Sequence, residues 1–98
     1  MKKMFVLVRK DLPKTYQAVQ AGHALAEYLQ NEDTEWDNGT LIYLHVVNEQ
    51  ELFKWKDDLA DQRIAARHFI EPDIGDQATA LACVTDRYEL FENLNLVS

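Results

Sequence analysis

The sequence predicts a three-layer α/β/α sandwich with a four-stranded mixed sheet. Apolar segments of strand length alternate with segments that carry apolar residues at helical spacing, in the order β-α-β-α-β-β-α. Such alternation is typical of α/β domains. The last two strand segments are joined by a connection too short for a helical crossover, so we expect that pair to be antiparallel. Residues 1–98 are expected to form a single domain.

The first strand is predicted at Met4–Val8, a continuous apolar run that suits a strand covered on both faces. Pro13 follows and favours the start of a helix, which we expect at about 15–30. Its glycine, Gly22, costs about 1 kcal/mol relative to alanine, so we expect it to lie close against a strand. The inner stripe of this helix is predicted to contain Ala18, Gly22, Leu25, Ala26 and Leu29.

The second strand is predicted at Thr40–Val47, after a polar loop. Asn48 and Glu51 form a capping pattern, which marks the start of a second helix. The apolar residues of this helix at helical spacing are Leu52, Trp55 and Leu59.

Two further strands are predicted at about 64–70 and 79–84, joined by the polar connection 71–77. Asp86 is then expected to cap a short last helix that ends near residue 93. Because the connection is short, it returns the chain directly beside the third strand.

Composition excludes several classes of protein. No apolar run approaches the roughly 20 residues of a membrane span, and the N-terminal apolar segment is too short for a secretory signal. We therefore expect a cytoplasmic protein without a membrane partner. Cys83 is the single cysteine and lies in an apolar run, which predicts a buried, unreactive thiol. The three histidines lack ligand spacing, which argues against a zinc site. The sequence also has no Gly-rich phosphate loop, and we expect neither a metal nor a cofactor.

The formal net charge is −7, but it is unevenly spread. Residues 1–22 hold five basic side chains and one acidic one, whereas the remainder holds five basic and sixteen acidic ones. This balance argues against broad electrostatic binding of nucleic acid. The basic end is still suited to holding one phosphate locally. The alternative is that the acids simply form a solvated surface.

The entrance of the first helix is the first candidate site. Free backbone N–H groups at a helix start attract anions, and Lys14 lies at that entrance. Arg9 and Lys10 end the preceding strand. The cluster is suited to a phosphate or a developing oxyanion. Its alternative role is a solvated basic turn.

Gln20 and His23 form the second candidate, because residues three apart share one face of a helix. Gln20 offers a donor and an acceptor, and His23 exchanges a proton near neutrality. Glu27 is placed to orient the His23 ring. A structural histidine bonded to that glutamate is the alternative.

The polar connection supplies the third candidate. If the fourth strand pairs with the first, Asp73 or Asp76 is delivered to the helix entrance, where a carboxylate orients or deprotonates a water. Thr79 adds a hydroxyl at the start of that strand. The alternative is turn chemistry, which aspartate favours for its own reasons.

Two blocks of this sequence form a pattern when taken together. The first block is FVLVRKDL followed by AVQAGHA, and the second is FIEPDIGDQATALACV. These blocks resemble the archaeal/eukaryotic-type (type II) peptidyl-tRNA hydrolase family. In the second block Asp73 falls approximately at the position of the functional aspartate, and Thr79 at that of a recurring threonine. In the first block the matching residues are Arg9, Asp11, Leu12, Ala18, Gln20, His23 and Ala24.

The resemblance implies a homodimer that hydrolyses the ester between a peptide and the 3′ ribose of tRNA. By that resemblance Asp73 orients water, Lys14 binds phosphate or the oxyanion, and Gln20 positions the ester. His23 and Thr79 support the site. The remaining implied substrate-binding residues are Arg9, Lys10 and Tyr16.

One departure divides the interpretations. The family's proposed catalytic lysine corresponds to Tyr16, whereas Lys14 matches an earlier lysine of the motif. The leading hypothesis is a peptidyl-tRNA hydrolase-like ester hydrolase. The alternative is a catalytically degenerate, dimeric binding module of the same fold. A small-molecule hydrolase is a third class. An open cleft shared by Lys14, Gln20 and Asp73 would favour the enzyme, and a cleft filled by Tyr16 would favour the binding module.

Overall fold

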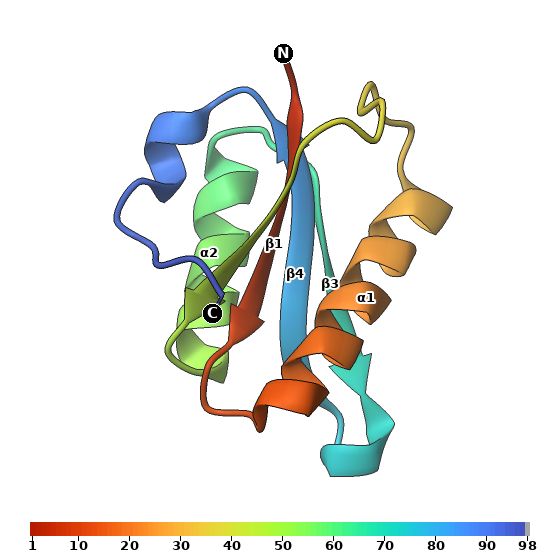
Figure 1. The fold of residues 1–98 in the computed structure, drawn as a ribbon, viewed down its shortest axis with the longest axis vertical. Helices are drawn as coiled ribbons and strands as arrows, with labels where there is room; N and C mark the ends of the chain where they lie inside the picture. The colour runs from red at the N-terminus through yellow and green to blue at the C-terminus, as the bar shows by residue number, and fades with distance from the viewer. Residues whose placement is uncertain (98) are drawn as a thin grey trace.

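The computed structural model describes residues 1–97 and confirms the predicted order of strands and helices as far as the fourth strand (Figure 1). The strands form one four-stranded sheet in the order β2-β1-β4-β3. β1 runs parallel to β2 and antiparallel to β4, and β4 runs antiparallel to β3. The sheet is therefore mixed, as the short β3–β4 connection predicts. The elements are β1 (Lys3–Arg9), α1 (Lys14–Asn31), β2 (Leu41–Val46), α2 (Glu49–Asp61), β3 (Ala66–Glu71), the 3₁₀ turn η1 (Pro72–Ile74), β4 (Gln77–Thr85) and the 3₁₀ turn η2 (Tyr88–Phe91).

Helices cover both faces of the sheet, with α1 on one side and α2 on the other (Figure 1). The two central strands supply most of the core, because their side chains alternate between the two faces. On β1, Met4, Val6 and Val8 pack beneath α1, whereas Phe5 and Leu7 pack beneath α2. All five are buried. A strand buried on both faces is what the continuous apolar run predicts.

Cys83 lies on β4 and is fully buried on the α2 side of the sheet. Burial raises the pKa of its thiol to about 12. Because the thiolate is the reactive form, we expect the folded protein to resist an aromatic disulfide reagent at neutral pH. One thiol should react after denaturation in guanidinium. Rapid, stoichiometric reaction of the native protein would contradict this assignment.

The predicted inner stripe of α1 is wrong. Its buried residues are Gln17, Gln20, Ala21, Ala24 and Tyr28. The physical reason is that two glutamines are buried through hydrogen bonds, which turns the helix away from the phase that apolar residues alone indicate. Of the predicted stripe, Ala18, Ala26 and Leu29 are exposed, and Gly22 and Leu25 are only partly buried.

The expected close approach at Gly22 is also absent. A Cβ atom built on Gly22 would meet nothing within 4 Å. Packing therefore does not require a glycine at position 22 in this structure.

The start of α2 confirms the predicted cap. The Asn48 side chain accepts a hydrogen bond from the backbone N–H of Glu51 at 3.0 Å. Leu52 and Leu59 are buried and Trp55 packs at the border of the same core. Asn48 therefore satisfies one of the free donors at the helix start.

The expected last helix is instead the 3₁₀ turn η2, and Asp86 does not cap it. Residue 87 occupies the cap position, and its backbone N–H donates to the Thr85 hydroxyl at 3.0 Å. Phe91 holds the turn, since its ring stacks on Phe5 at 4.2 Å and on Trp55 at 5.2 Å. This aromatic anchor fixes the segment with a single turn, so a longer helix is not required.

The segment after η2 returns along β2, which the sequence did not predict. The backbone N–H of His45 donates to the Asn95 carbonyl at 2.9 Å, and Val97 donates to the Tyr43 carbonyl at 3.0 Å. The edge of β2 is thereby covered. Within residues 1–97, the helices are too short or too polar to cross a bilayer.

Candidate functional site

Gln20 is the centre of a buried polar cluster between α1 and the β3–β4 hairpin. Its side chain is fully buried. The amide nitrogen donates to Glu71 Oε1 at 2.9 Å, and the amide oxygen accepts from the Thr79 hydroxyl at 2.6 Å. Both functions of the amide are therefore satisfied, which fixes its orientation.

A β-bulge brings Thr79 to this cluster. Phe69 of β3 pairs with Ala80, but the next residue, Ile70, pairs with Ala78, so Thr79 is the extra residue of β4. Ala78 faces α2 and Ala80 faces α1. The bulge turns the Thr79 hydroxyl toward α1, where it reaches Gln20.

Glu71 ends β3 and completes the cluster with Tyr16. The Tyr16 hydroxyl donates to Glu71 Oε1 at 3.2 Å. The pKa of Glu71 lies below its ordinary value, chiefly because Gln20 donates to the carboxylate and also because Tyr16 and the Asp73 amide do so. Burial raises the pKa of Tyr16, and the negative charge of Glu71 raises it further. We call Tyr16, Gln20, Glu71 and Thr79 the Glu71 cluster.

Asp73 lies two residues beyond Glu71, in η1, and is exposed. Its negative charge is the smallest of the contributions that raise the pKa of Tyr16. The carboxylate that Gln20 contacts is nevertheless Glu71, which sequence reasoning missed. The sequence feature that could have indicated Glu71 is its position at the end of a strand, directly before the aspartate-rich turn. The role predicted for Asp73 stays a prediction.

His23 is exposed and its ring stacks on Phe69, with centroids 4.4 Å apart and planes 10° apart. Its charge also helps to lower the pKa of Glu71. The interpretation that Glu27 orients this ring is wrong, because the Glu27 carboxylate accepts from Asn31 at 2.8 Å instead. The stack on Phe69 holds His23 at the edge of the Glu71 cluster.

Arg9 belongs to a separate polar group on the α2 side. Its guanidinium forms a bidentate pair with Asp11, with both N–O distances at 2.9 Å. It also donates to Gln77 Oε1 at 2.8 Å and to the Ala78 carbonyl at 3.0 Å. Asp11 raises the pKa of Arg9, and Arg9 lowers that of Asp11. Only one of the five N–H groups of the Arg9 guanidinium is left outside these bonds. Arg9 therefore stabilises the end of the sheet and has little capacity left to bind a substrate.

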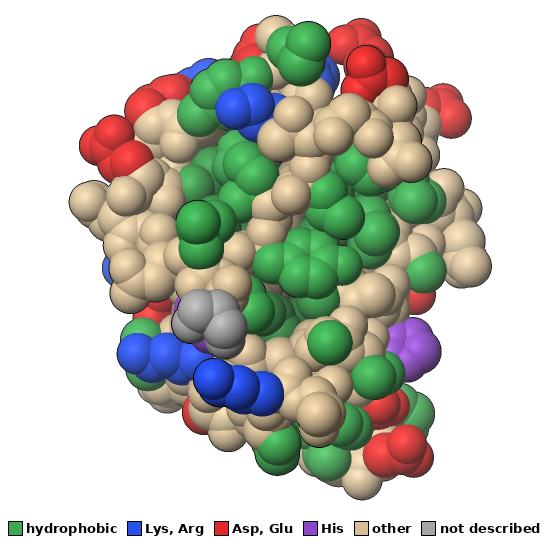
Figure 2. Space-filling view, in the orientation of Figure 1, with side chains coloured by type: hydrophobic (Ala, Val, Ile, Leu, Met, Phe, Trp, Pro, Cys, Tyr) green, Lys and Arg blue, Asp and Glu red, His purple; other side chains and the backbone are tan. Residues whose placement is uncertain are grey.

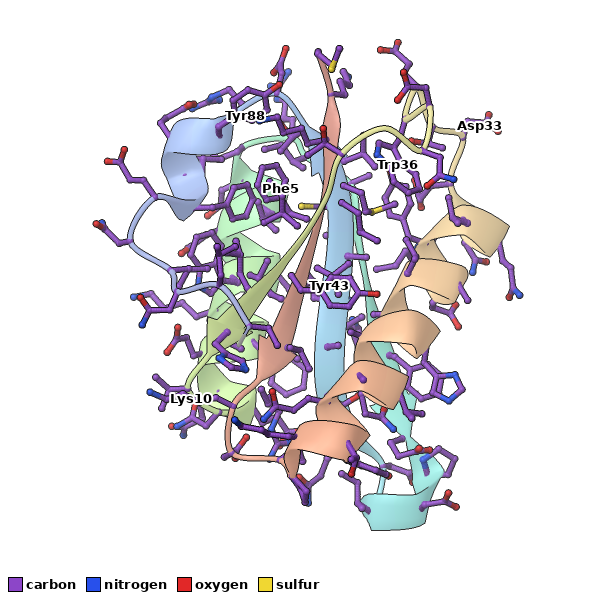
Figure 3. The ribbon with its side chains drawn as sticks, in the orientation of Figure 1. Phe5, Lys10, Asp33, Trp36, Tyr43 and Tyr88 are labelled. Carbon is purple, nitrogen blue, oxygen red and sulfur yellow. The ribbon has the colours of Figure 1, made fainter. Side chains whose placement is uncertain are left out.

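Lys10 and Lys14 are both exposed at the start of α1 (Figure 3 labels Lys10). No side chain caps this helix, and its first turn carries no acidic residue. These features suit the anion-binding role suggested for Lys14 and the free N–H groups, which stays a prediction. On this side Gln17 contacts His45, 2.6 Å from its Nε2 atom.

The structure thus places Gln20, Thr79 and Tyr16 together and adds Glu71, whereas Asp73 lies exposed in η1, two residues beyond Glu71. It places Lys10 and Lys14 near the same helix entrance and Arg9 on the other face of the sheet. No cluster of three metal-ligating side chains occurs within the described part of the chain. The arrangement offers a stable carboxylate, a tyrosine hydroxyl and an anion-attracting helix start around one turn.

A scan against protein-family models finds no match to this chain, and a search of curated proteins finds none either. Among solved structures, it is similar to a protein of unknown function from Agrobacterium tumefaciens. The TM-score is 0.71 at 12% identity, over 99% of this chain and 98% of the other. At this identity the similarity supports the α/β fold and carries no activity.

Proposed function

We propose that this protein is an ester hydrolase resembling type II peptidyl-tRNA hydrolase, with Glu71 as its water-orienting carboxylate. The observation that carries the proposal is the hydrogen bond from buried Gln20 to Glu71, beside the uncapped start of α1. Two residues of the resembling motifs, Gln20 and Thr79, are joined by a hydrogen bond and meet the Glu71 carboxylate, which the motifs do not indicate. The proposal gives Glu71 the role that the sequence suggested for Asp73.

The lowered pKa of Glu71 decides what it does in this scheme. A carboxylate that already accepts hydrogen bonds from Gln20 and Tyr16 is a weak base, but it is suited to accepting a hydrogen bond from water and orienting it. The oriented water adds to the ester carbonyl, and its oxygen joins the acyl carbon. Lys14 and the N–H groups of α1 stabilise the resulting oxyanion. The C–O bond to the ribose then breaks, and the ribose oxygen takes up the proton that the attacking water has lost.

Two conservative variants separate the carboxylates. We expect Glu71→Gln to lower hydrolysis of an N-blocked aminoacyl-tRNA by more than about tenfold, because glutamine keeps the size but loses the charge. Asp73→Asn should change it by less than about threefold. Circular dichroism and thermal melting of both variants would show that they remain folded. Loss in Asp73→Asn alone would return the role to Asp73, and no loss in either would remove the carboxylate mechanism.

The second candidate, a catalytically degenerate binding module, is favoured by one specific observation. The Tyr16 hydroxyl donates a hydrogen bond to Glu71, and Glu71 is only 8% exposed. Tyr16 occupies the position at which the resembling family has its lysine. The net charge of −7 also weakens attraction to tRNA. A cleft filled by Tyr16 was the feature expected to favour a binding module, and the contact of Tyr16 with Glu71 supports that candidate.

Tyr16→Lys tests the choice directly. If the wild-type protein hydrolyses the substrate, the enzyme proposal holds and Tyr16 substitutes for the lysine. If only Tyr16→Lys is active, the site is degenerate and the second candidate holds. Tyr16→Phe is the matched control, since it keeps the ring and removes the hydrogen bond to Glu71. Inactivity of all three proteins would end the hydrolase proposal.

A further inference from the structure

A polar recess lies at the ends of β1 and β2, and none of the residues of the Glu71 cluster lines it. It has a volume of about 180 Å³ and is formed by the ends of β1 and β2, the start of α2 and the segment after η2. Because a water takes about 30 Å³ in the liquid, the recess holds several groups of that size. Its polar lining residues are Lys10, His45, Glu51, Asn93 and Asn95.

The wall at His45 is fixed by hydrogen bonds on both its backbone and its ring. Its backbone N–H donates to the Asn95 carbonyl at 2.9 Å. Gln17 Nε2 donates to the Leu12 carbonyl at 2.7 Å, which leaves Gln17 Oε1 as the acceptor for His45 Nε2 at 2.6 Å. This network assigns the proton to Nε2 and leaves Nδ1 as the unprotonated ring nitrogen.

Besides His45, the titratable residues that line this recess are one base, Lys10, and one acid, Glu51. Neither Lys10 nor Lys14 is part of an ion pair within residues 1–97. Nearby Asp11 is engaged by Arg9, so Glu51 is the remaining acid of the lining. The Glu51 carboxylate accepts from the Val47 N–H at 3.3 Å. Figure 2 shows Lys and Arg side chains gathered at the lower left, whereas Asp and Glu dominate the upper margin.

Burial lowers the pKa of His45, and the charges of Lys10 and Lys14 lower it further. These two ammonium groups therefore act on the ring although they are exposed. A bound anion would oppose them and make protonation of His45 easier. The pKa of His45 therefore depends on the charge bound in the recess and can be used to detect an anion there.

We propose that this recess binds a phosphate group, held by the Lys10 ammonium group with polar contacts from His45 and Asn93, while Lys14 at the start of α1 adds positive charge outside the lining. The proposal does not depend on hydrolysis, because it uses none of the Glu71 cluster. The phosphate could belong to a nucleic-acid backbone or to a small phosphorylated molecule. Both present the same tetrahedral anion, which Lys binds as a point charge.

The test is an NMR titration of the full chain with inorganic phosphate and, separately, with a trinucleotide that ends in a 3′ adenosine. We expect millimolar phosphate to shift the Lys10, His45 and Asn93 resonances and to raise the pKa of His45. Tighter binding of the trinucleotide would identify a nucleic-acid backbone, and equal or weaker binding would identify a small phosphate ligand. No shift with either ligand would overturn the proposal.

The matched variants are Lys10→Ala/Lys14→Ala and the control Lys2→Ala/Lys3→Ala, which removes the same charge from the opposite end of β1. The first should weaken phosphate binding by about tenfold or more and raise the pKa of His45 in the free protein. The control should leave both unchanged. Equal weakening in the two double variants would mean that phosphate senses only net charge, which would also overturn the site.

Discussion

Replacing Gln20 by alanine is expected to lower the free energy of unfolding by about 3 kcal/mol. Gln20 is fully buried, so alanine leaves a cavity. It also leaves the Thr79 hydroxyl and Glu71 without the amide that each now contacts. Urea denaturation followed by circular dichroism measures the change. Gln30→Ala, an exposed substitution in the same helix, is the control and should change stability by less than about 0.5 kcal/mol.

The pH dependence of this variant provides a second readout. Gln20 is the largest cause of the lowered pKa of Glu71, whose ordinary value is 4.5. A depressed carboxyl pKa contributes stability above that value, and the contribution is lost as pH falls through the folded-state pKa. The difference in stability between wild type and Gln20→Ala should therefore shrink below pH 4.5. A constant difference down to strongly acid pH would show that Gln20 acts by packing alone.

The second large effect is expected at Arg9. Arg9→Met should lower the free energy of unfolding by about 2 kcal/mol, because methionine keeps the buried stem but removes four charged hydrogen bonds. The Ala78 carbonyl would lose its donor at the end of the sheet. The estimate stays moderate because the Asp11 side chain is 42% exposed and water can replace its partner.

Asp11 provides the residue-level measurement for this prediction. Arg9 lowers its pKa in the wild-type protein, so the pKa should rise toward the ordinary value in Arg9→Met. Carboxyl NMR shifts across an acid titration measure it. Arg9→Lys keeps the charge without the planar fork and should fall between the two proteins in stability. A fully stable Arg9→Met variant would contradict the structural role of Arg9 and would favour the substrate-binding role that the sequence suggested.

The strands were the most predictable part of the fold. The runs at Met4–Val8 and 79–84 are so apolar that only a central, doubly covered strand accommodates them. The short 71–77 connection fixed the antiparallel pairing of β3 with β4. Element ends shifted by one or two residues, since strand ends depend on pairing partners that the sequence does not display.

The candidate site was predictable only in part. The motif pointed to Gln20 and Thr79, and the structure brings these two together. It could not indicate the bulge that aims Thr79 or the choice of Glu71 over Asp73 as the partner of Gln20. Such choices depend on register, because a shift of one residue in a strand reverses the face of every side chain.

The sequence by itself determined the α/β class, the mixed sheet and the buried cysteine, because local apolar patterns and a short connection are enough to specify them. Only the tertiary structure decided which face of α1 is buried, which carboxylate Gln20 holds and what covers the edge of β2. The physical reason is that buried polar side chains are placed by their hydrogen-bond partners. The partners of Gln20, for example, are Glu71 and Thr79, which lie 51 and 59 positions away along the chain.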